Sequence, residues 1–222
     1  LPELSIRHTM AAFNCYACHR RDDVGGPEGE MLVHFTGNEA LGNEGTIPPP
    51  LTGVGRKFQP GWLRTVLSGE GKMRPYMPTR MPFFGLSNVE HLVQQFAEAD
   101  PSQESSLSNG DVEAGRLLLG TEGGVGCITC HGLNARRGLA MEALSLTDST
   151  KRYRPGWFKE NLIHPTKLRP GTLMPSFWPD GIAGNQSILD GDTDQQIAAI
   201  WSYLEIGKPL PPGYPNFEKG AF

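Results

Sequence analysis

The sequence lacks several features that would each point to a particular class of protein. Its longest apolar stretches, such as Ile197–Leu204, fall far short of the roughly 18 residues that a membrane-spanning helix needs. No signal peptide is visible. With 20 Lys and Arg against 24 Asp and Glu, the chain also lacks the basic excess typical of nucleic-acid-binding proteins. We therefore expect neither a membrane span nor a nucleic-acid partner within these 222 residues.

Hydrophobic residues are also scarce for a chain of this length. They make up 38% of the sequence, which is little for one large core, so two smaller domains are the better expectation. The 28 Gly and 19 Pro make the chain rich in loops without reaching the level typical of disorder. Because the first residue is Leu1 rather than Met, we expect a processed mature chain or a piece of a larger protein with further domains.

Cysteine is rare, and all four cysteines fall into two clusters of identical spacing. The clusters read Cys15-Tyr-Ala-Cys18-His19 and Cys127-Ile-Thr-Cys130-His131. Each is a C-x-x-C-H motif, which is typical of covalent attachment of c-type haem. The two thiols reach the two vinyl groups on one edge of the porphyrin, and the adjacent histidine becomes an axial ligand of the iron.

Other uses of paired cysteines fit this sequence less well. A zinc ribbon would place its two C-x-x-C units about 15–20 residues apart, whereas 109 positions separate Cys18 from Cys127. A thioredoxin-like pair needs a βαβ context, and no alternating strand pattern surrounds either motif. Disulfides would leave both adjacent histidines unexplained. The sequence therefore predicts two covalently bound haem c groups.

The chain contains an internal repeat, one copy for each haem motif. A stretch from Leu51 to Trp62 matches a stretch from Leu146 to Trp157 without a gap, including a shared Pro-Gly-Trp. The matches that follow pair Arg74-Pro75 with Arg169-Pro170, and Thr79–Phe84 with Thr172–Phe177. The first copy has 17 more residues than the second around Gly25–Pro50, which predicts an exposed loop.

The repeat predicts two tandem domains, at 1–100 and 111–222, joined by a polar linker at 101–110. Only 14 residues precede Cys15, so we expect the opening helix of the first domain to be short or cut off. In the second domain a helix is expected over 111–119, ahead of the haem motif.

A further helix is expected late in each domain. In the first, Ser87 or Asn88 is expected to cap a helix with an apolar stripe formed by Val89, Leu92, Val93 and Phe96. In the second, Thr193 or Asp194 is expected to cap a helix that ends at Gly207.

These motifs resemble the class I cytochrome c family, twice over and across nearly the whole chain. The match includes the early C-x-x-C-H, a late Met-Pro segment, and the wording Pro170-Gly-Thr-Leu-Met174-Pro175. The resemblance implies an all-α, loop-rich fold with one covalent haem in each domain. It also implies methionine as the sixth iron ligand and electron transfer as the activity.

Carried over to this sequence, the resemblance assigns residues to both haems. The covalent attachment points are Cys15, Cys18, Cys127 and Cys130, and the proximal ligands are His19 and His131. Met174 is the distal candidate for haem 2, with His164 as its alternative. For haem 1 the repeat alignment favours Met81 over Met77, and Met73 is a third choice.

The resemblance also implies that a proline carbonyl accepts the proximal imidazole N–H of haem 1, and Pro50 fits that role. Its aligned residue is Ser145, so in the second domain the bond is expected from another carbonyl or to be weaker. Two tryptophans and four cations are candidates for contact with haem or its propionates, the cations alternatively forming solvated surface: Trp62, Trp157, Arg56, Lys57, Lys151 and Arg152.

Iron held from both sides by protein ligands has no vacant position for a substrate, so the sequence favours an electron carrier rather than an enzyme. The alternatives are a dihaem enzyme, such as a peroxidase or a thiosulfate dehydrogenase, and a haem-based gas sensor. Thiosulfate dehydrogenases with an axial cysteine are disfavoured because no cysteine is left over. Covalent haem attachment takes place outside the bacterial cytoplasm, so a periplasmic or otherwise exported protein with protein redox partners is expected.

Overall fold

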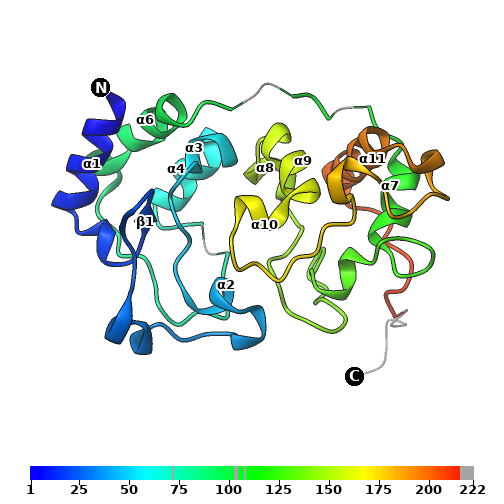
Figure 1. The fold of residues 1–222 in the computed structure, drawn as a ribbon, viewed down its shortest axis with the longest axis horizontal. Coiled ribbons are helices and arrows are strands. Elements are labelled where there is room, and N and C mark those ends of the chain that lie inside the picture. Colours follow the sequence, from blue (N-terminus) through cyan, green and yellow to red (C-terminus); the bar gives the residue numbers. More distant parts are fainter. Residues whose placement is uncertain (72, 103–104, 108, 216–222) are drawn as a thin grey trace. The chain divides into compact units, whose positions relative to one another are not determined.

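The computed structural model describes residues 1–71, 73–102, 105–107 and 109–215 (Figure 1). Helices hold 47% of the residues and strands 5%, which confirms the expected mainly helical, loop-rich chain. The two named strands in the described part, β1 (Arg20–Arg21) and β2 (Val24–Gly25), form a short antiparallel pair. In the described ranges, no helix has both the length and the apolar character to cross a membrane.

The chain divides into two compact units whose composition differs from the expected tandem division. The first unit contains Leu1–Ser105, Lys151–Asn161 and Pro165–Pro175, and the second contains Ser106–Thr150, Leu162–His164 and Ser176–Phe222. Of the expected linker at 101–110, positions 103, 104 and 108 lie outside the described residues.

Hydrogen bonds attach the start of the 151–175 stretch to the first unit. Gln59 N donates to the Arg152 carbonyl at 2.8 Å, and Arg154 N donates to the Lys57 carbonyl at 2.9 Å. Arg154 Nε also donates to the Gly55 carbonyl at 3.0 Å. Part of the second repeat therefore belongs to the first unit.

The core of the first unit lies between its first and last helices before residue 105. The helices of this part include α1 (Pro2–Ala12), α3 (Val54–Lys57), α4 (Pro60–Leu67), α5 (Leu86–Val89) and α6 (His91–Ala99). The helix α1 contacts α6 (Figure 1). The buried core residues are Ile6, Met10, Val54, Leu63, Val89, Leu92 and Phe96.

Two expectations for these helices need correction. With 11 residues, α1 is longer than its counterpart α7 (Val112–Leu119) with 8, so the opening helix of the first unit is not the short one. The helix expected from Ser87 or Asn88 begins at Leu86 and is interrupted at Glu90, which separates α5 from α6. The expected apolar stripe is largely right, because all of its members except the half-buried Val93 are buried.

A buried arginine links three segments of the first unit. The side chain of Arg21 is 3% exposed and donates to Glu3 at 2.8 Å and to Asp100 at 3.0 Å. It also donates to the Leu51 carbonyl at 2.9 Å. Burial opposes the charge of Arg21, but the hydrogen bonds with Glu3 and Asp100 outweigh it and raise the pKa of the guanidinium.

The extra segment of the first repeat is largely exposed, as predicted, but it contains short helices. These are η2 (Gly29–His34), η3 (Glu39–Leu41) and α2 (Asn43–Thr46). A hydrogen bond from Asn38 N to the Gly45 carbonyl at 3.1 Å closes the turn, and Leu41 is buried. Glu44 lies in α2, within the turn that this hydrogen bond closes.

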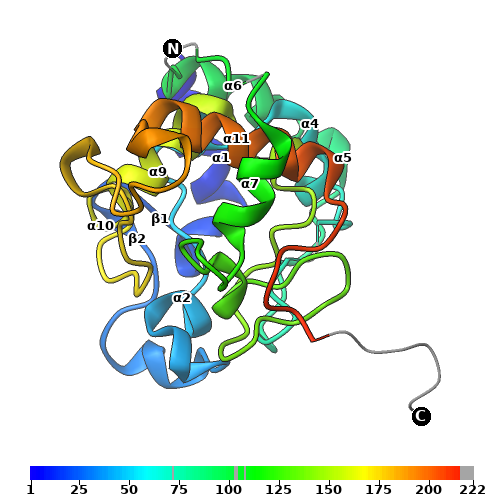
Figure 2. The same cartoon turned by 90° about the vertical axis from the view of Figure 1, so that its right-hand side faces the viewer.

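The second unit is built on the pair α7 and α11 (Thr193–Ile206), which lie against each other (Figure 2). They approach closely at Gly115, where an added Cβ would lie 2.0 Å from the Ala199 carbonyl oxygen.

The ends of both helices follow from their sequences. The helix expected over 111–119 is present as α7, with Asp111 as its cap, and Gly207 ends α11 with φ +69°, as predicted. The cap of α11 is Asp192, just before the expected residues, and its carboxylate accepts from Gln195 N at 2.9 Å.

The repeat predicted from the sequence is visible in the helices that follow each haem motif. The helices α8 (Ser149–Arg152) and α9 (Pro155–Ile163) begin 95 residues after α3 and α4, the offset of the sequence match. Both α4 and α9 begin at the proline of Pro-Gly-Trp, because the first helical position needs no N–H donor. Three further short helices follow α9: α10 (Pro165–Leu168), η5 (Pro179–Gly181) and η6 (Leu189–Gly191).

Candidate functional site

Both C-x-x-C-H motifs fold into the same turn. Their first three residues form short 3₁₀ helices, η1 (Cys15–Ala17) and η4 (Cys127–Thr129). The backbone N–H of the histidine donates to the carbonyl of the first cysteine, at 2.8 Å in the first motif and at 3.0 Å in the second. The turn therefore carries two thiols and an imidazole on the same backbone arrangement in each unit.

The residue before each motif has a left-handed backbone conformation. Asn14 has φ +54° and Gly126 has φ +75°. Asparagine and glycine are residue types that adopt this conformation readily. The carbonyl of each also accepts the N–H of the residue three positions on, at 3.1 Å for Asn14 and 2.9 Å for Gly126. The residue type at this position thus sets the start of each haem-motif turn.

Each motif histidine is held through its Nδ1 atom by a backbone carbonyl. His19 Nδ1 lies 2.7 Å from the Pro49 oxygen, and His131 Nδ1 lies 2.7 Å from the Leu144 oxygen. Because a carbonyl oxygen only accepts, Nδ1 must carry the proton, and Nε2 becomes the nitrogen that can bind a metal. Burial lowers the pKa of His19. The hydrogen bond with Pro49 raises this pKa by less than burial lowers it, and the charge of Arg74 lowers it further. The net effect favours the neutral imidazole, which is the ligating form.

The expected acceptor in the first unit, Pro50, is wrong by one residue. The Leu51 N–H donates to the Arg20 carbonyl at 2.7 Å, and with this register the Pro49 carbonyl faces the neighbouring His19.

The second unit repeats this pattern. Leu146 N donates to the Gly132 carbonyl at 2.8 Å, and Leu144, the residue aligned with Pro49, accepts from the histidine. For the second unit the sequence left two alternatives: the histidine bonds to a carbonyl other than that of Ser145, or its bond is weaker than that of His19. The first alternative is correct, and the bond has the same length in both units.

None of the four cysteines takes part in a disulfide, and each is half-buried within its own turn. Burial raises the pKa of the Cys127 thiol to about 12 and also raises the pKa of Cys15. Within the described ranges, no group of three or more His, Cys, Asp or Glu side chains is arranged to hold a metal ion. Each motif presents two thiols in one turn next to an oriented imidazole, a donor set that fits covalent haem.

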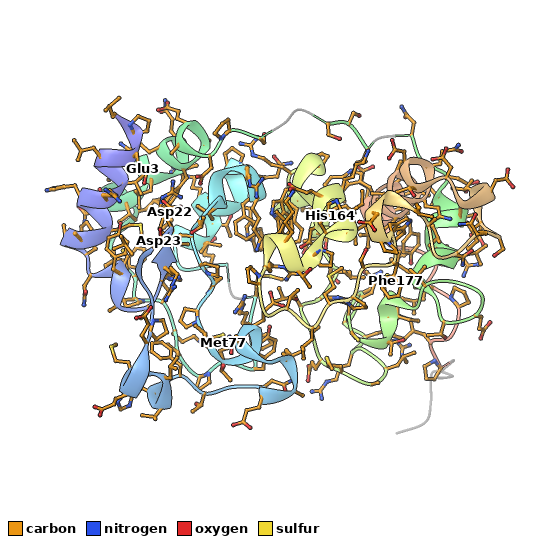
Figure 3. All side chains as sticks on the ribbon, in the orientation of Figure 1. Glu3, Asp22, Asp23, Met77, His164 and Phe177 are labelled. Atoms are coloured by element: carbon orange, nitrogen blue, oxygen red, sulfur yellow. The ribbon has the colours of Figure 1, made fainter. Side chains whose placement is uncertain are left out.

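The structure does not support the preference for Met81 over Met77. Met81 is 42% exposed, whereas Met77 is 4% exposed and lies beside α2 (Figure 3). The third choice, Met73, is half-buried. The Arg74 Nη1 atom lies 3.8 Å from the Met77 sulfur, and the charge of Arg74 also acts on His19. Of the two candidates, Met77 is the one whose side chain the first unit encloses.

Met174 lies in the first unit, while His131 lies in the second. The Met174 sulfur is 3.3 Å from Arg169 Nη2 and 3.8 Å from Asn161 Nδ2. Among the described residues, the Nε atom of Arg169 and the Oδ1 atom of Asn161 are buried without a hydrogen-bond partner. Buried polar atoms of this kind are costly and indicate a place for a further polar group, which fits a bound haem. His164, the alternative ligand, is half-buried and follows α9 (Figure 3).

Two of the four predicted cations fit the alternative of a solvated surface. Lys151 is exposed. Arg56 forms a pair with Glu160 at 3.3 Å in which both side chains keep about a third or more of their surface in solvent. Neither arrangement requires a haem to explain it.

The other two predicted cations are enclosed by aromatic rings, which include both predicted tryptophans. Arg152 is 2% exposed, and its guanidinium lies 6.0 Å from the ring centroid of the half-buried Trp62. The Trp157 ring is buried, stacks on Tyr153 at 4.9 Å, and lies 4.7 Å from Lys57 Nζ. Burial and the charges of nearby arginines lower the pKa of Lys57 to about 7. Cationic groups are thus gathered in an enclosed region, as a site for carboxylate groups requires.

Sequence reasoning missed three charged residues at the site, Arg74, Arg169 and Glu44. A signal for the arginines was present, because Arg74-Pro75 and Arg169-Pro170 align in the repeat. Each arginine lies within 4 Å of a candidate methionine sulfur. Nothing in the sequence marked Glu44, because it lies in the segment that is longer in the first repeat.

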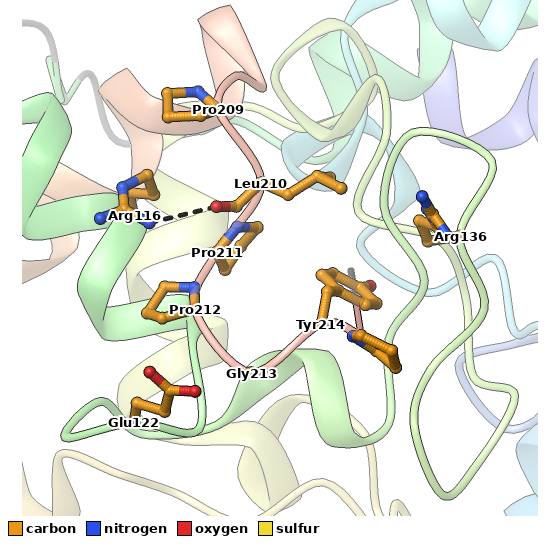
Figure 4. Close-up of a pocket in the computed structure, with 10 residues that line it drawn as sticks. Arg116, Glu122, Arg136, Pro209, Leu210, Pro211, Pro212, Gly213 and Tyr214 are labelled. Atoms are coloured by element: carbon orange, nitrogen blue, oxygen red, sulfur yellow. Dashed lines mark hydrogen bonds between the residues drawn. The ribbon is translucent and has the colours of Figure 1, made fainter. Parts of the chain in front are cut away.

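A cavity of about 570 Å³ lies in the second unit (Figure 4). It is lined by the segment from Pro209 to Pro215 and by Arg116, Glu122 and Arg136. Arg116 donates to the Leu210 carbonyl at 3.1 Å, as drawn in Figure 4. The Tyr214 hydroxyl donates to the His131 carbonyl at 3.4 Å, so this segment is joined to the second haem motif.

Comparison with known proteins gives no match: no protein-family model, no curated protein and no solved structure matches the chain. The case for a function therefore depends on the residues of this chain and their geometry.

Proposed function

We propose that this protein is a dihaem electron-transfer cytochrome of two class I cytochrome c-like repeats, with one covalent haem c on each motif. The observation that carries the proposal is the repeated proximal arrangement. The two C-x-x-C-H turns share their backbone hydrogen bonds, and each presents a histidine held at Nδ1 by a carbonyl 2.7 Å away. One such turn alone would be weaker support, because short turns serve many purposes.

The proposed ligands are His19 and Met77 for haem 1, and His131 and Met174 for haem 2. Haem supplies reversible one-electron chemistry when bound. The carbonyl bonds fix each imidazole in one tautomer and orientation, which strengthens it as a donor. Ligation by histidine and methionine leaves no position for a substrate and raises the reduction potential. The residues thus favour a carrier that exchanges electrons with protein partners, in the periplasm or otherwise outside the bacterial cytoplasm.

The haem count tests the proposal directly. Pyridine haemochrome quantitation of the purified protein should give two haems c per chain. The double variant Cys15→Ala/Cys18→Ala should give one, and so should Cys127→Ala/Cys130→Ala. A colourless wild-type protein, or one that holds metal without tetrapyrrole, contradicts the proposal.

The sixth ligands are tested by the far-red absorption band of methionine bound to ferric haem. Met77→Ala should remove the share of this band that belongs to haem 1, and the matched control Met81→Ala in the same loop should leave it intact. Met174→Ala should remove the share of haem 2. If Met81→Ala alone removes the haem 1 share, the repeat alignment is right and the inference from burial is wrong.

Carbon monoxide distinguishes a carrier from the alternative functions. A dihaem enzyme or a gas sensor needs one iron with an open or easily displaced sixth position. We expect the reduced wild-type protein to bind carbon monoxide poorly at neutral pH, and Met77→Ala to bind it promptly. Prompt binding by the wild type would favour an enzyme or a sensor.

A further inference from the structure

Glu44 is bonded to two arginines that approach different candidate methionines. Its backbone carbonyl accepts from Arg74 Nη1 at 2.9 Å, and its Oε1 atom accepts from Arg169 Nη1 at 2.7 Å. The same Arg74 nitrogen lies 3.8 Å from the Met77 sulfur, and Arg169 Nη2 lies 3.3 Å from the Met174 sulfur. A continuous chain of contacts inside the first unit therefore connects the two methionines through one acidic residue.

The carboxylate of Glu44 is held in place at both oxygens. While Oε1 accepts from Arg169, Oε2 accepts from the Thr172 hydroxyl at 2.7 Å. The Thr172 hydroxyl also accepts from Met174 N at 3.3 Å. Glu44 and Arg169 are both less than a third exposed, so solvent screens their charges less than those of a surface pair.

Lys57 lies in the first unit with Glu44, Arg74 and Arg169, and the charges of all three act on its ammonium. Its ammonium lies 4.7 Å from the Trp157 ring centroid. Burial, followed by the charges of Arg169 and Arg74, lowers the pKa of Lys57, and the carboxylate of Glu44 opposes this effect. Glu44, Lys57, Arg74 and Arg169 form what we call the Glu44 cluster.

We propose that the Glu44 cluster acts electrostatically on both haems and sets their two reduction potentials together. The inference rests on the proposed function. Ferric haem carries one more positive charge than ferrous haem, so a nearby carboxylate stabilises the ferric state and a nearby ammonium stabilises the ferrous state. Because the cluster reaches both methionines, a change of charge within it acts at both sites.

The test is spectroelectrochemical titration of the complete dihaem protein, at a pH below the pKa of Lys57 so that its ammonium is charged. Glu44→Gln keeps the size of the side chain and removes its charge. We expect both midpoint potentials to rise, each ferric–ferrous equilibrium moving about threefold to tenfold toward ferrous haem, where tenfold is 59 mV for one electron. Lys57→Met removes a charge of the opposite sign, and both potentials should fall.

Each variant has a matched control on the surface. Glu39→Gln removes a carboxylate from an exposed residue five positions before Glu44, and Lys167→Met removes an exposed ammonium from α10 in the same unit. Solvent and salt screen charges at such sites, so neither control should move the potentials measurably.

The possible outcomes separate the inference from the function on which it rests. Both potentials moving together, in opposite directions for Glu44→Gln and Lys57→Met, supports a shared cluster. The inference is overturned if only one midpoint potential moves or if neither moves. It is also overturned if the potentials of the control variants move by as much. Since Lys57→Met is measured independently, a Glu44→Gln protein that fails to fold still leaves a deciding result. A haem count other than two in the wild type overturns the proposed function itself.

Discussion

The two C-x-x-C-H motifs are alike in how their histidines are held and different in what surrounds them. In both units the histidine Nδ1 lies 2.7 Å from a carbonyl at the aligned position. In both, a left-handed residue three positions after the histidine, Asp22 or Asn134, donates its N–H to an aligned threonine hydroxyl. The histidine side of each motif is held by the same set of bonds in both units, and these bonds persist while the surrounding packing diverges.

The divergence is clearest two positions after each histidine. There the first unit has Arg21, 3% exposed and bonded to Glu3 and Asp100, and the second has Leu133, 1% exposed. One unit therefore fixes this position with a buried ion-pair network and the other with a buried apolar side chain. A buried charge depends strongly on its partners, whereas a leucine depends on the volume that it fills.

Removing a partner of the buried arginine should produce the largest loss of stability. Among the described residues, Asp100→Ala leaves Arg21 with the half-exposed Glu3 as its carboxylate partner, and it also removes the acceptor of the Gly55 N–H. We expect the first unit to lose about 3 kcal/mol of unfolding free energy, as for one broken partner of a buried pair. Urea unfolding followed by far-UV circular dichroism measures the change.

The matched control is a surface pair of the second unit, Arg116 with Glu113. Glu113→Ala removes an exposed carboxylate that bonds to Arg116 one turn further along α7. Solvent screens such a pair, so no measurable change is expected. Equal effects of the two substitutions would show that Arg21 is not a buried anchor.

The close contact of α7 with α11 gives the next largest effect. A Cβ at Gly115 would lie 2.0 Å from the Ala199 carbonyl oxygen, so Gly115→Ala must push the helices apart. We expect a loss of about 1–3 kcal/mol from the second unit, as for other overpacked sites. Gly61→Ala is the control, because nothing lies within 4 Å of its added Cβ and α4 is a helix in which alanine is favourable. Gly61→Ala should leave the unfolding midpoint unchanged or raise it.

What the sequence could predict follows the range of the interactions. The helix expected over 111–119 and the end of the last helix at Gly207 depend on neighbouring residues, and the structure has them. The acceptor Pro49 was missed by one residue, because the alignment of the Pro49 segment against the His19 segment cannot be read from either segment alone.

The distal side could not be predicted in the same way. The alignment compares residue types, and Met81 shares more neighbours with Met174 than Met77 does. Burial depends on the path of the whole loop, and it encloses Met77 instead. Glu44 was invisible for a similar reason, since its partners Arg74 and Arg169 lie 30 and 125 positions away.

A smaller difference between the motifs is expected at the residue before each first cysteine. Gly126→Ala places a Cβ on a residue with φ +75°, which costs about 1–2 kcal/mol. Asn14→Ala should cost less, because asparagine already has a Cβ at φ +54°, and Asn14→Gly should be neutral or slightly stabilising. Urea midpoints of the three variants check this order. A larger loss for Asn14→Ala than for Gly126→Ala would mean that the side chain of Asn14 has a further role.

The smallest effect should come from the threonines that hold the left-handed residues after the histidines. Thr147 Oγ1 accepts from Asn134 N at 2.8 Å in a half-buried position, while Thr52 Oγ1 accepts from Asp22 N at 2.6 Å in an exposed one. Valine keeps the shape of threonine and removes the acceptor. Thr147→Val should therefore cost about 1 kcal/mol, and Thr52→Val less, because water can replace an exposed hydroxyl. Losses of the same size in urea unfolding would show that this bond is equivalent in energy as well as in geometry in the two units.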